Sequence, residues 1–360
     1  MSCCRLFALL IACVALTPIP STGAQPTANP ANATCFESSV SLASRWRDPN
    51  CVPFAHDAPF NVPIPPRPRL DTRSVTIIAF YVGLSGGGLR DLQTDEDDES
   101  SDYQHPIYFS SPKDPEYKIH CTRSWGRCEL EGQVVPIPVG AQPAGGTDAH
   151  MAIIDRARRK EYDFWQAARN RNGDVYDIAW GGEFSLYGSG IAGPKGGATA
   201  AGFAESEGLI RPEEIAAGAI HHALFMVLPC SSGRYVYPAV HVDHPCTDTS
   251  SAASMGARMQ LALSDSQIDA LPAPTYAKTI WRALAHYGAF YGDSGSRGIQ
   301  FQTESPLTYR ALGTDDPWDR IAARYGVPHR GRYSFAIDPP GIDLTKYLRI
   351  IDPCVTKRTC

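Results

Sequence analysis

Short apolar runs separated by turn residues fill the chain from about Gly145 onward, and this spacing limits the fold more than any other feature. Gly, Pro and Asn interrupt the runs at short intervals, which favours antiparallel sheets over repeated βαβ units. The runs are 151–155, 161–166, 175–187, 220–228, 235–242, 257–263 and 299–303. An earlier run, 74–83, is expected to be the first strand. We therefore expect a mainly β fold, an antiparallel β-sandwich of the jelly-roll or concanavalin type.

Three segments have the pattern of helices that would flank these sheets. Segment 211–218 has Pro212 near its first turn and Gly218 just past its end. Segments 274–288 and 315–326 carry apolar residues at helical spacing and end in glycine. The sequence thus predicts a few helices around the sandwich.

The first 24 residues have the features of a secretion signal. Arg5 precedes an apolar run, and the small residues Thr22 and Ala24 suit cleavage after Ala24. No stretch of the chain approaches the roughly 20 apolar residues of a membrane span. We expect a secreted protein, extracellular or periplasmic, with no membrane span.

Composition divides the rest of the chain. Residues 25–72 are Pro-rich and read as a tether, residues 73–352 as the catalytic domain, and residues 353–360 as a disulfide-closed tail. The sequon at Asn32 would be glycosylated in a eukaryotic host. The net charge of −5 gives no basic surface for nucleic acid. No cofactor is expected, and we expect a monomer.

Eight of the eleven cysteines follow the signal. An even number in a secreted chain indicates disulfides. Because they fall into neighbouring couples, we pair them by proximity: Cys35–Cys51, Cys121–Cys128, Cys230–Cys246 and Cys354–Cys360. No C-x-x-C spacing supports zinc.

The segment IHHALFMVLPCSSGRYVYPAVHVD carries histidines within apolar runs. If its two runs form a symmetric hairpin, His222 faces His241. The same face then holds Tyr235, Tyr237 and Asp243. Aromatic rings with groups that titrate near neutral pH are what a glycan cleft needs. The alternative is a buried structural His222 and a surface His241.

A second hairpin is expected in HMAIIDRARRKEYDFWQA, which begins at His150. Asp163 lies between two aromatic residues and is followed by Trp165. An apolar setting would raise the pKa of Asp163, and a carboxylate beside an indole is typical of a sugar subsite. Trp180 is a further glycan-facing candidate.

Arg258 and Gln260 share one face of the run 257–263. Arg258 could clamp a carboxylate substituent of a sugar, or form a structural ion pair. The sequence YGDSGSRG contains G-D-S-G, the nucleophile signature of chymotrypsin-like proteases, but it lacks that context and is better explained as a glycine-rich turn. Asp293 within it remains a candidate carboxylate.

Several segments between about Gly145 and Gly298 resemble a family of uncharacterised secreted bacterial proteins. They are GTDAHMAIIDRARRKEYDFWQA, GATAAGFAESEGLIRPEEIAAGAIHHAL, YVYPA, MGARMQL and ALAHYGAFYGDSG. The resemblance covers about two-fifths of the chain and brings no activity with it. It draws attention to five residues: His150, Asp163, His222, Arg258 and Asp293.

The leading hypothesis is a secreted glycoside hydrolase that cleaves an extracellular polysaccharide. Such enzymes place two carboxyl groups on either side of the scissile bond. Asp163 would be the general acid or nucleophile and Asp293 the second carboxylate. His222 and His241 would orient the substrate or tune the carboxylates. The sugar subsites would be lined by Trp165, Trp180, Tyr235 and Tyr237.

Three alternatives stay open. In a polysaccharide lyase, Arg258 or Gln260 would neutralise a uronate carboxylate while His222 or Tyr237 removes the adjacent proton. In a non-catalytic glycan-binding protein, the aromatic residues bind sugar and the histidines are structural. A metal site would use His150, His222, His241 and Asp163, although no close His pair supports it.

Overall fold

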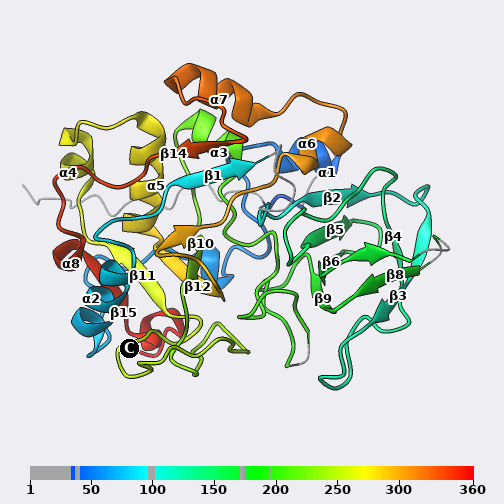
Figure 1. The fold of residues 1–360 in the computed structure, drawn as a ribbon, viewed down its shortest axis with the longest axis horizontal. Coiled ribbons are helices and arrows are strands. Elements are labelled where there is room, and N and C mark those ends of the chain that lie inside the picture. Colours follow the sequence, from blue (N-terminus) through cyan, green and yellow to red (C-terminus); the bar gives the residue numbers. More distant parts are fainter. Residues whose placement is uncertain (1–33, 37–40, 96–101, 171–172, 174, 195) are drawn as a thin grey trace, which may run out of the picture. The chain divides into compact units, whose positions relative to one another are not determined.

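Short helices and strands alternate along the chain, and the described strands form four sheets (Figure 1). The computed structural model describes residues 34–36, 41–95, 102–170, 173, 175–194 and 196–360. The predicted signal peptide and the sequon at Asn32 lie outside these residues. Mainly β structure with a few helices is confirmed.

A five-stranded mixed sheet lies in the largest hydrophobic core. Its strands, in spatial order, are β13 (Gln300–Phe301), β10 (Leu224–Leu228), β12 (Ala289–Ser294), β11 (Arg258–Leu261) and β15 (Leu348–Ile351). β10 and β12 run parallel, and the other pairs are antiparallel. Helices α2 (Ser74–Leu84) and α5 (Thr275–His286) pack against this sheet at β15 and β11.

Two four-stranded sheets share a second core. The first, in spatial order, is β2 (Ile107–Ser110), β5 (Met151–Asp155), β6 (Lys160–Trp165) and β9 (Trp180–Ser185). The second is β4 (Val134–Pro136), β3 (Glu116–Cys121), β8 (Val175–Ile178) and β7 (Ala168–Arg169). Tyr162 and Phe164 of β6 meet Ile119 of β3 in this core. A two-stranded sheet joins β1 (Leu92–Asp95) to β14 (Arg332–Phe335).

The three predicted helices are confirmed as α3 (Pro212–Ala217), α5 (Thr275–His286) and α7 (Pro317–Tyr325). Gly218 and Gly326 end α3 and α7 at positive φ, the conformation that favours glycine after a helix. The remaining helices are α1 (Leu42–Trp46), η1 (Pro59–Asn61), α2 (Ser74–Leu84), α4 (Asp265–Ala270), α6 (Leu307–Ala311), α8 (Leu344–Tyr347) and α9 (Pro353–Thr356).

The first predicted strand, 74–83, is wrong: this segment is helix α2. A short continuous apolar run fits a buried strand or a helix equally well, because periodicity does not separate them. In the structure Ile77, Ile78 and Tyr81 are buried while Val75 is 79% exposed, so burial follows the helical repeat.

The predicted hairpin over residues 220–242 is also wrong. β10 pairs with β12 and β13 instead, and residues 235–242 form no strand. Pro238, which has no backbone N–H to donate, lies in the middle of the expected second strand. Residues 235–242 therefore run as a loop, tied back to β10's end by the Cys230–Cys246 disulfide.

All four disulfides join the neighbours that proximity predicts, and they are compatible with a secreted protein. Phe54 and Phe60, in the Pro-rich segment expected to be a tether, are fully buried. That part of the segment is therefore packed into the fold. In the part of the chain that the structure describes, no helix combines the length and apolar character needed to cross a membrane.

Candidate active site

A cavity of about 530 Å³ lies where one end of the β2-β5-β6-β9 sheet meets the end of β12 and two loops. One loop contains Gly197–Ala200 and the other His241–Asp243. A Cβ at Gly182 of β9 would lie 2.1 Å from the Gly197 amide nitrogen, so only glycine lets the first loop approach this strand. The cavity therefore collects residues from segments that are far apart in the sequence.

Three indole rings form one wall. Trp165 ends β6 and Trp180 begins β9, and the two lie opposite each other in the strand register. Trp125 stacks on Trp165 with ring centroids 5.6 Å apart and lies 5.8 Å from Trp180. Trp125 comes from the loop closed by the Cys121–Cys128 disulfide, and it is 64% exposed. This tryptophan wall offers an apolar aromatic surface to the cavity.

Three carboxylates line the cavity: Asp148, Asp243 and Asp293. Asp148 accepts a hydrogen bond of 3.1 Å from the Trp165 indole N–H, which fixes it beside the tryptophan wall. Asp243 accepts a bond of 2.8 Å from the Ser294 hydroxyl at the exposed rim. Asp293 accepts bonds from the backbone N–H groups of Ser294 and Ala200. We call these three residues the acid wall.

His150 lines the cavity next to the acid wall and is 4% exposed. Its Nδ1 donates to the Glu205 carboxylate at 2.6 Å. Burial by itself lowers the pKa of His150, but Glu205, Asp293 and Asp148 together raise it to about 9. His150 is therefore an imidazolium at neutral pH.

Asp293 has the electrostatics of a general acid. Burial, reinforced by the Asp243 carboxylate, raises the pKa of Asp293 to about 7, although the His150 imidazolium pulls it down. A carboxyl group with such a pKa is partly protonated at neutral pH and can give up that proton in a reaction.

A buried acidic cluster lies behind the cavity: Glu161, Asp163, Glu205 and Glu207. Asp163 accepts a bond of 2.8 Å from the Glu205 N–H, and Ser206 donates twice to Glu161. Burial and the neighbouring carboxylates raise the pKa of Asp163 well above its usual value, the direction expected from its sequence setting. Asp163 is fully buried and does not line the cavity, so it supports Glu205 and His150 from behind.

His222 lies in another place from His241. Its Nε2 contacts the Glu214 carboxylate at 2.9 Å, and its Nδ1 donates to the Ala223 carbonyl. Arg211 completes this buried ionic cluster with a bond of 2.7 Å to Glu214. His222 thus has the structural role that was its alternative, while His241 lines the cavity and contacts the Gly196 carbonyl at 3.2 Å.

The remaining candidates lie away from the acid wall. Arg258 and Tyr237 line a second, larger cavity. Gln260 bonds to the Ala285 carbonyl and to Arg349. Tyr235 is 54% exposed and lines neither cavity. The structure therefore brings together six of the residues that the sequence singled out: His150, Trp165, Trp180, His241, Asp243 and Asp293.

Trp125 and Asp148 are among the cavity residues that were absent from the sequence-based candidates. The sequence does point to Trp125, since a tryptophan inside a short disulfide loop must be held near the surface. Asp148 lies two residues before His150, and Ala149 between them has a positive φ of 40°. No local pattern indicates that these two side chains share a cavity.

Among the residues that the structure describes, no group of three or more His, Cys, Asp or Glu side chains is arranged to hold a metal ion. No protein-family model, curated protein or solved structure matches the chain.

Proposed function

We propose that the chain is a secreted glycoside hydrolase that cleaves an extracellular polysaccharide in the cavity between the tryptophan wall and the acid wall. The observation that carries the proposal is the position of Asp293, whose pKa is raised to about 7, in the same cavity as three clustered indoles. Indole faces stack on the apolar faces of sugar rings, while a protonated carboxyl group cleaves the bond between them.

In the proposed reaction Asp293 protonates the glycosidic oxygen as the bond from the anomeric carbon to that oxygen breaks. The positive charge that develops on the sugar faces a carboxylate on the acid wall. We assign this second role to Asp148, because the Trp165 indole N–H orients it beside the sugar platform. Water then adds at the anomeric carbon and gives up its proton to the carboxylate pair.

His150 sets the charge of the acid wall. Its imidazolium, held by Glu205, keeps the pKa of Asp293 from rising further. Asp163 and Glu161 hold the segment that carries Glu205 through bonds to its backbone and to Ser206. The sequence suggested Asp163 as the reacting acid. In this proposal Asp163 is a positioning residue instead.

The proposal also includes two expectations from the sequence, secretion and a β-sandwich. Secretion is supported by the four disulfides together with the signal-like sequence of residues 1–24. A sandwich arrangement is supported for the two four-stranded sheets that share one hydrophobic core. The cavity that contains the acid wall lies at the end of one of these sheets.

The test is incubation of the purified protein with a panel of neutral and acidic polysaccharides, with assays for new reducing ends and for unsaturated products. We expect reducing ends alone. Asp293→Asn and Asp148→Asn should each lower the rate about 10² to 10⁴-fold. Asp315→Asn, an exposed carboxylate outside the cavity, should keep full activity. A wild type that releases no reducing ends, or an active Asp293→Asn, would contradict the proposal.

The lyase alternative is favoured by one observation, the presence of Arg258 and Tyr237 in the same cavity. A uronate carboxylate could face the guanidinium while the phenol removes the neighbouring proton. Unsaturated products that disappear in Tyr237→Phe would support it. A glycan-binding protein without catalysis would bind sugar at the tryptophan wall with and without Asp293.

A further inference from the structure

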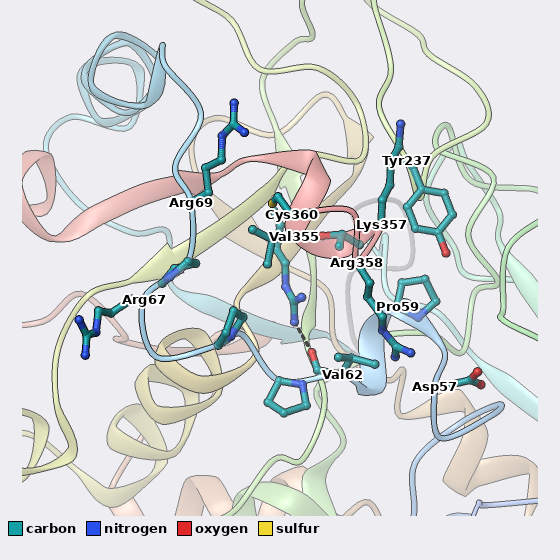
Figure 2. A pocket seen from close by; sticks show the side chains of 15 residues that line it. Asp57, Pro59, Val62, Arg67, Arg69, Tyr237, Val355, Lys357, Arg358 and Cys360 are labelled. Carbon is teal, nitrogen blue, oxygen red and sulfur yellow. Dashed lines mark hydrogen bonds between the residues drawn. The ribbon is translucent and has the colours of Figure 1, made fainter.

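A cavity of about 880 Å³ is lined by five cationic side chains, one aspartate and the last residue, Cys360. It lies between the N-terminal segment 57–69 and the C-terminal residues 355–360, with Tyr237 and Arg258 completing its lining. Figure 2 shows Arg67 and Arg69 on one side and Tyr237 with Lys357 on the other. The charged side chains that line it are Arg67, Arg69, Arg258, Lys357, Arg358 and Asp57. We call it the basic cavity.

Arg258 is a buried cation with no carboxylate partner among the described residues. It is 3% exposed, and its guanidinium donates to the carbonyls of Val62 and Tyr287 at 2.6 and 2.7 Å. The guanidinium also lies 4.8 Å from the Phe290 ring centre. Burial lowers the pKa of Arg258 to about 9, so it is still charged at neutral pH. A buried charge without a counter-ion is costly, and an anion entering the cavity would supply one.

The exposed rim of the basic cavity also holds cations without a carboxylate partner in the described part of the chain. Arg67, Lys357 and Arg358 are exposed and form no ion pair with any described residue, whereas Arg69 pairs with Asp352 at 2.9 Å. The rim therefore holds at least three cations that are free to meet a ligand. Tyr237, which is 41% exposed, adds an aromatic ring beside them.

We propose that the basic cavity binds an anionic sugar chain, one whose rings carry carboxylate groups. The cavity is in the size range of ligand sites, and its cations come from three separate segments, so they suit several anionic groups on one chain better than a single small anion. Guanidinium groups pair with carboxylates through two parallel bonds, and the Tyr237 ring offers a surface for a sugar face. The net charge of −5 over the chain disfavours nucleic acid. The proposal does not depend on hydrolysis in the cavity that contains the acid wall.

The test is calorimetric titration of the full mature protein with three probes: a hexamer of galacturonate, a neutral hexamer of glucose, and inorganic phosphate. Arg258 holds two backbone carbonyls, so its replacement would damage the fold. The rim triple variant Arg67→Gln, Lys357→Gln, Arg358→Gln avoids this. The triple variant Lys113→Gln, Lys118→Gln, Arg297→Gln removes the same charge from exposed sites outside both cavities.

We expect the galacturonate hexamer to bind the wild type and the charge-matched control equally, and the rim variant at least tenfold more weakly. Raised salt should weaken wild-type binding as well. Asp293→Asn should bind it unchanged, which separates this site from the proposed hydrolase. The proposal is overturned if the wild type does not bind the hexamer, if the control loses as much as the rim variant, if the Asp293 variant loses binding, or if phosphate or the neutral hexamer binds as tightly.

Discussion

His150, which lines the cavity, donates a hydrogen bond of 2.6 Å to Glu205. This bond connects the cavity to the buried acidic cluster behind it. The strand β6 explains why the connection exists. Its apolar side chains face the second core, so its acidic side chains face the segment that carries Glu205. The charge of His150 at the cavity is thus set partly by Glu205, a buried residue that does not line the cavity, and partly by Asp293 and Asp148, which do.

The stability of the fold should fall as the pH rises through the titration of His150. The pKa of His150 is raised from its usual value near 6.5 to about 9 in the folded state. Its contribution is therefore complete below about pH 6.5 and is lost as the pH approaches 9. The shift corresponds to at most about 3 to 4 kcal/mol of unfolding free energy. Urea unfolding of wild type and His150→Gln should differ most at pH 6 and least above pH 9.

His286 provides the control for this experiment, because its side chain is 53% exposed and paired with an exposed Asp265. His286→Gln should follow the wild type across the whole pH range. If His150→Gln runs parallel to the wild type from pH 6 to pH 9, the ion pair with Glu205 does not stabilise the fold.

The proposed acid gives a second pH dependence, in the rate. Because Asp293 must carry a proton and its pKa is raised to about 7, kcat/KM should fall above about pH 7. The His150 imidazolium lowers the pKa of Asp293, so His150→Gln should move this fall to higher pH, by about half a unit to one unit. The pH profile of reducing-end release measures it. A fall at unchanged or lower pH in the variant would remove His150 from the role of tuning Asp293.

Much of the local structure was predictable where a periodic pattern was long or bounded by clear signals. β5 and β6 follow from alternation on either side of a charged turn, and α3 and α7 from Pro at the start and Gly at the end. The disulfides follow from proximity. α2 was missed because its apolar run has no period that separates helix from strand.

The site was only partly predictable, since it depends on contacts between distant segments. Asp163 was identified as a perturbed carboxyl from its neighbours, but nothing local shows that the face it occupies is covered by residues 205–207. The pairing of His222 with His241 depended on a hairpin that Pro238 prevents. His150, Trp165 and Asp293 meet only because two different sheets end at the same cavity.

Glu207 should destabilise the folded chain at neutral pH. It is fully buried, and neither carboxyl oxygen has a hydrogen-bond partner among the described residues. Burial and Glu161 raise its pKa well above the usual value, so the unfolded state loses this proton first and stability falls as the pH rises above about 4.3. Glu207→Gln, which stays neutral, should raise the unfolding free energy by about 1 to 2 kcal/mol at pH 7.5 and by much less at pH 4.5.

Urea unfolding at these two pH values measures the effect. Glu116→Gln is the matched control, because Glu116 is exposed and pairs with Arg158 on the surface, where such pairs contribute about 1 kcal/mol or less. A Glu207→Gln protein that is less stable than the wild type at pH 7.5 would mean that the carboxylate has a partner which stabilises its charged form.

Trp125 should contribute to sugar binding and little to stability. Its side chain is 64% exposed, yet the Cys121–Cys128 loop holds it on Trp165 and Trp180. Trp125→Ala should weaken binding of the oligosaccharide product about tenfold, measured by tryptophan fluorescence, with a small change in unfolding free energy. Tyr103→Ala, an exposed aromatic residue outside the cavity, should leave affinity unchanged.

The double variant Cys121→Ser, Cys128→Ser tests whether the disulfide loop positions the Trp125 ring. It keeps the ring but frees the loop, at a cost of about 2.5 kcal/mol of unfolding free energy in the chain-entropy description. If the loop sets the position of the ring, this variant binds as weakly as Trp125→Ala; wild-type affinity in the double variant would show that stacking on Trp165 holds the ring without the disulfide.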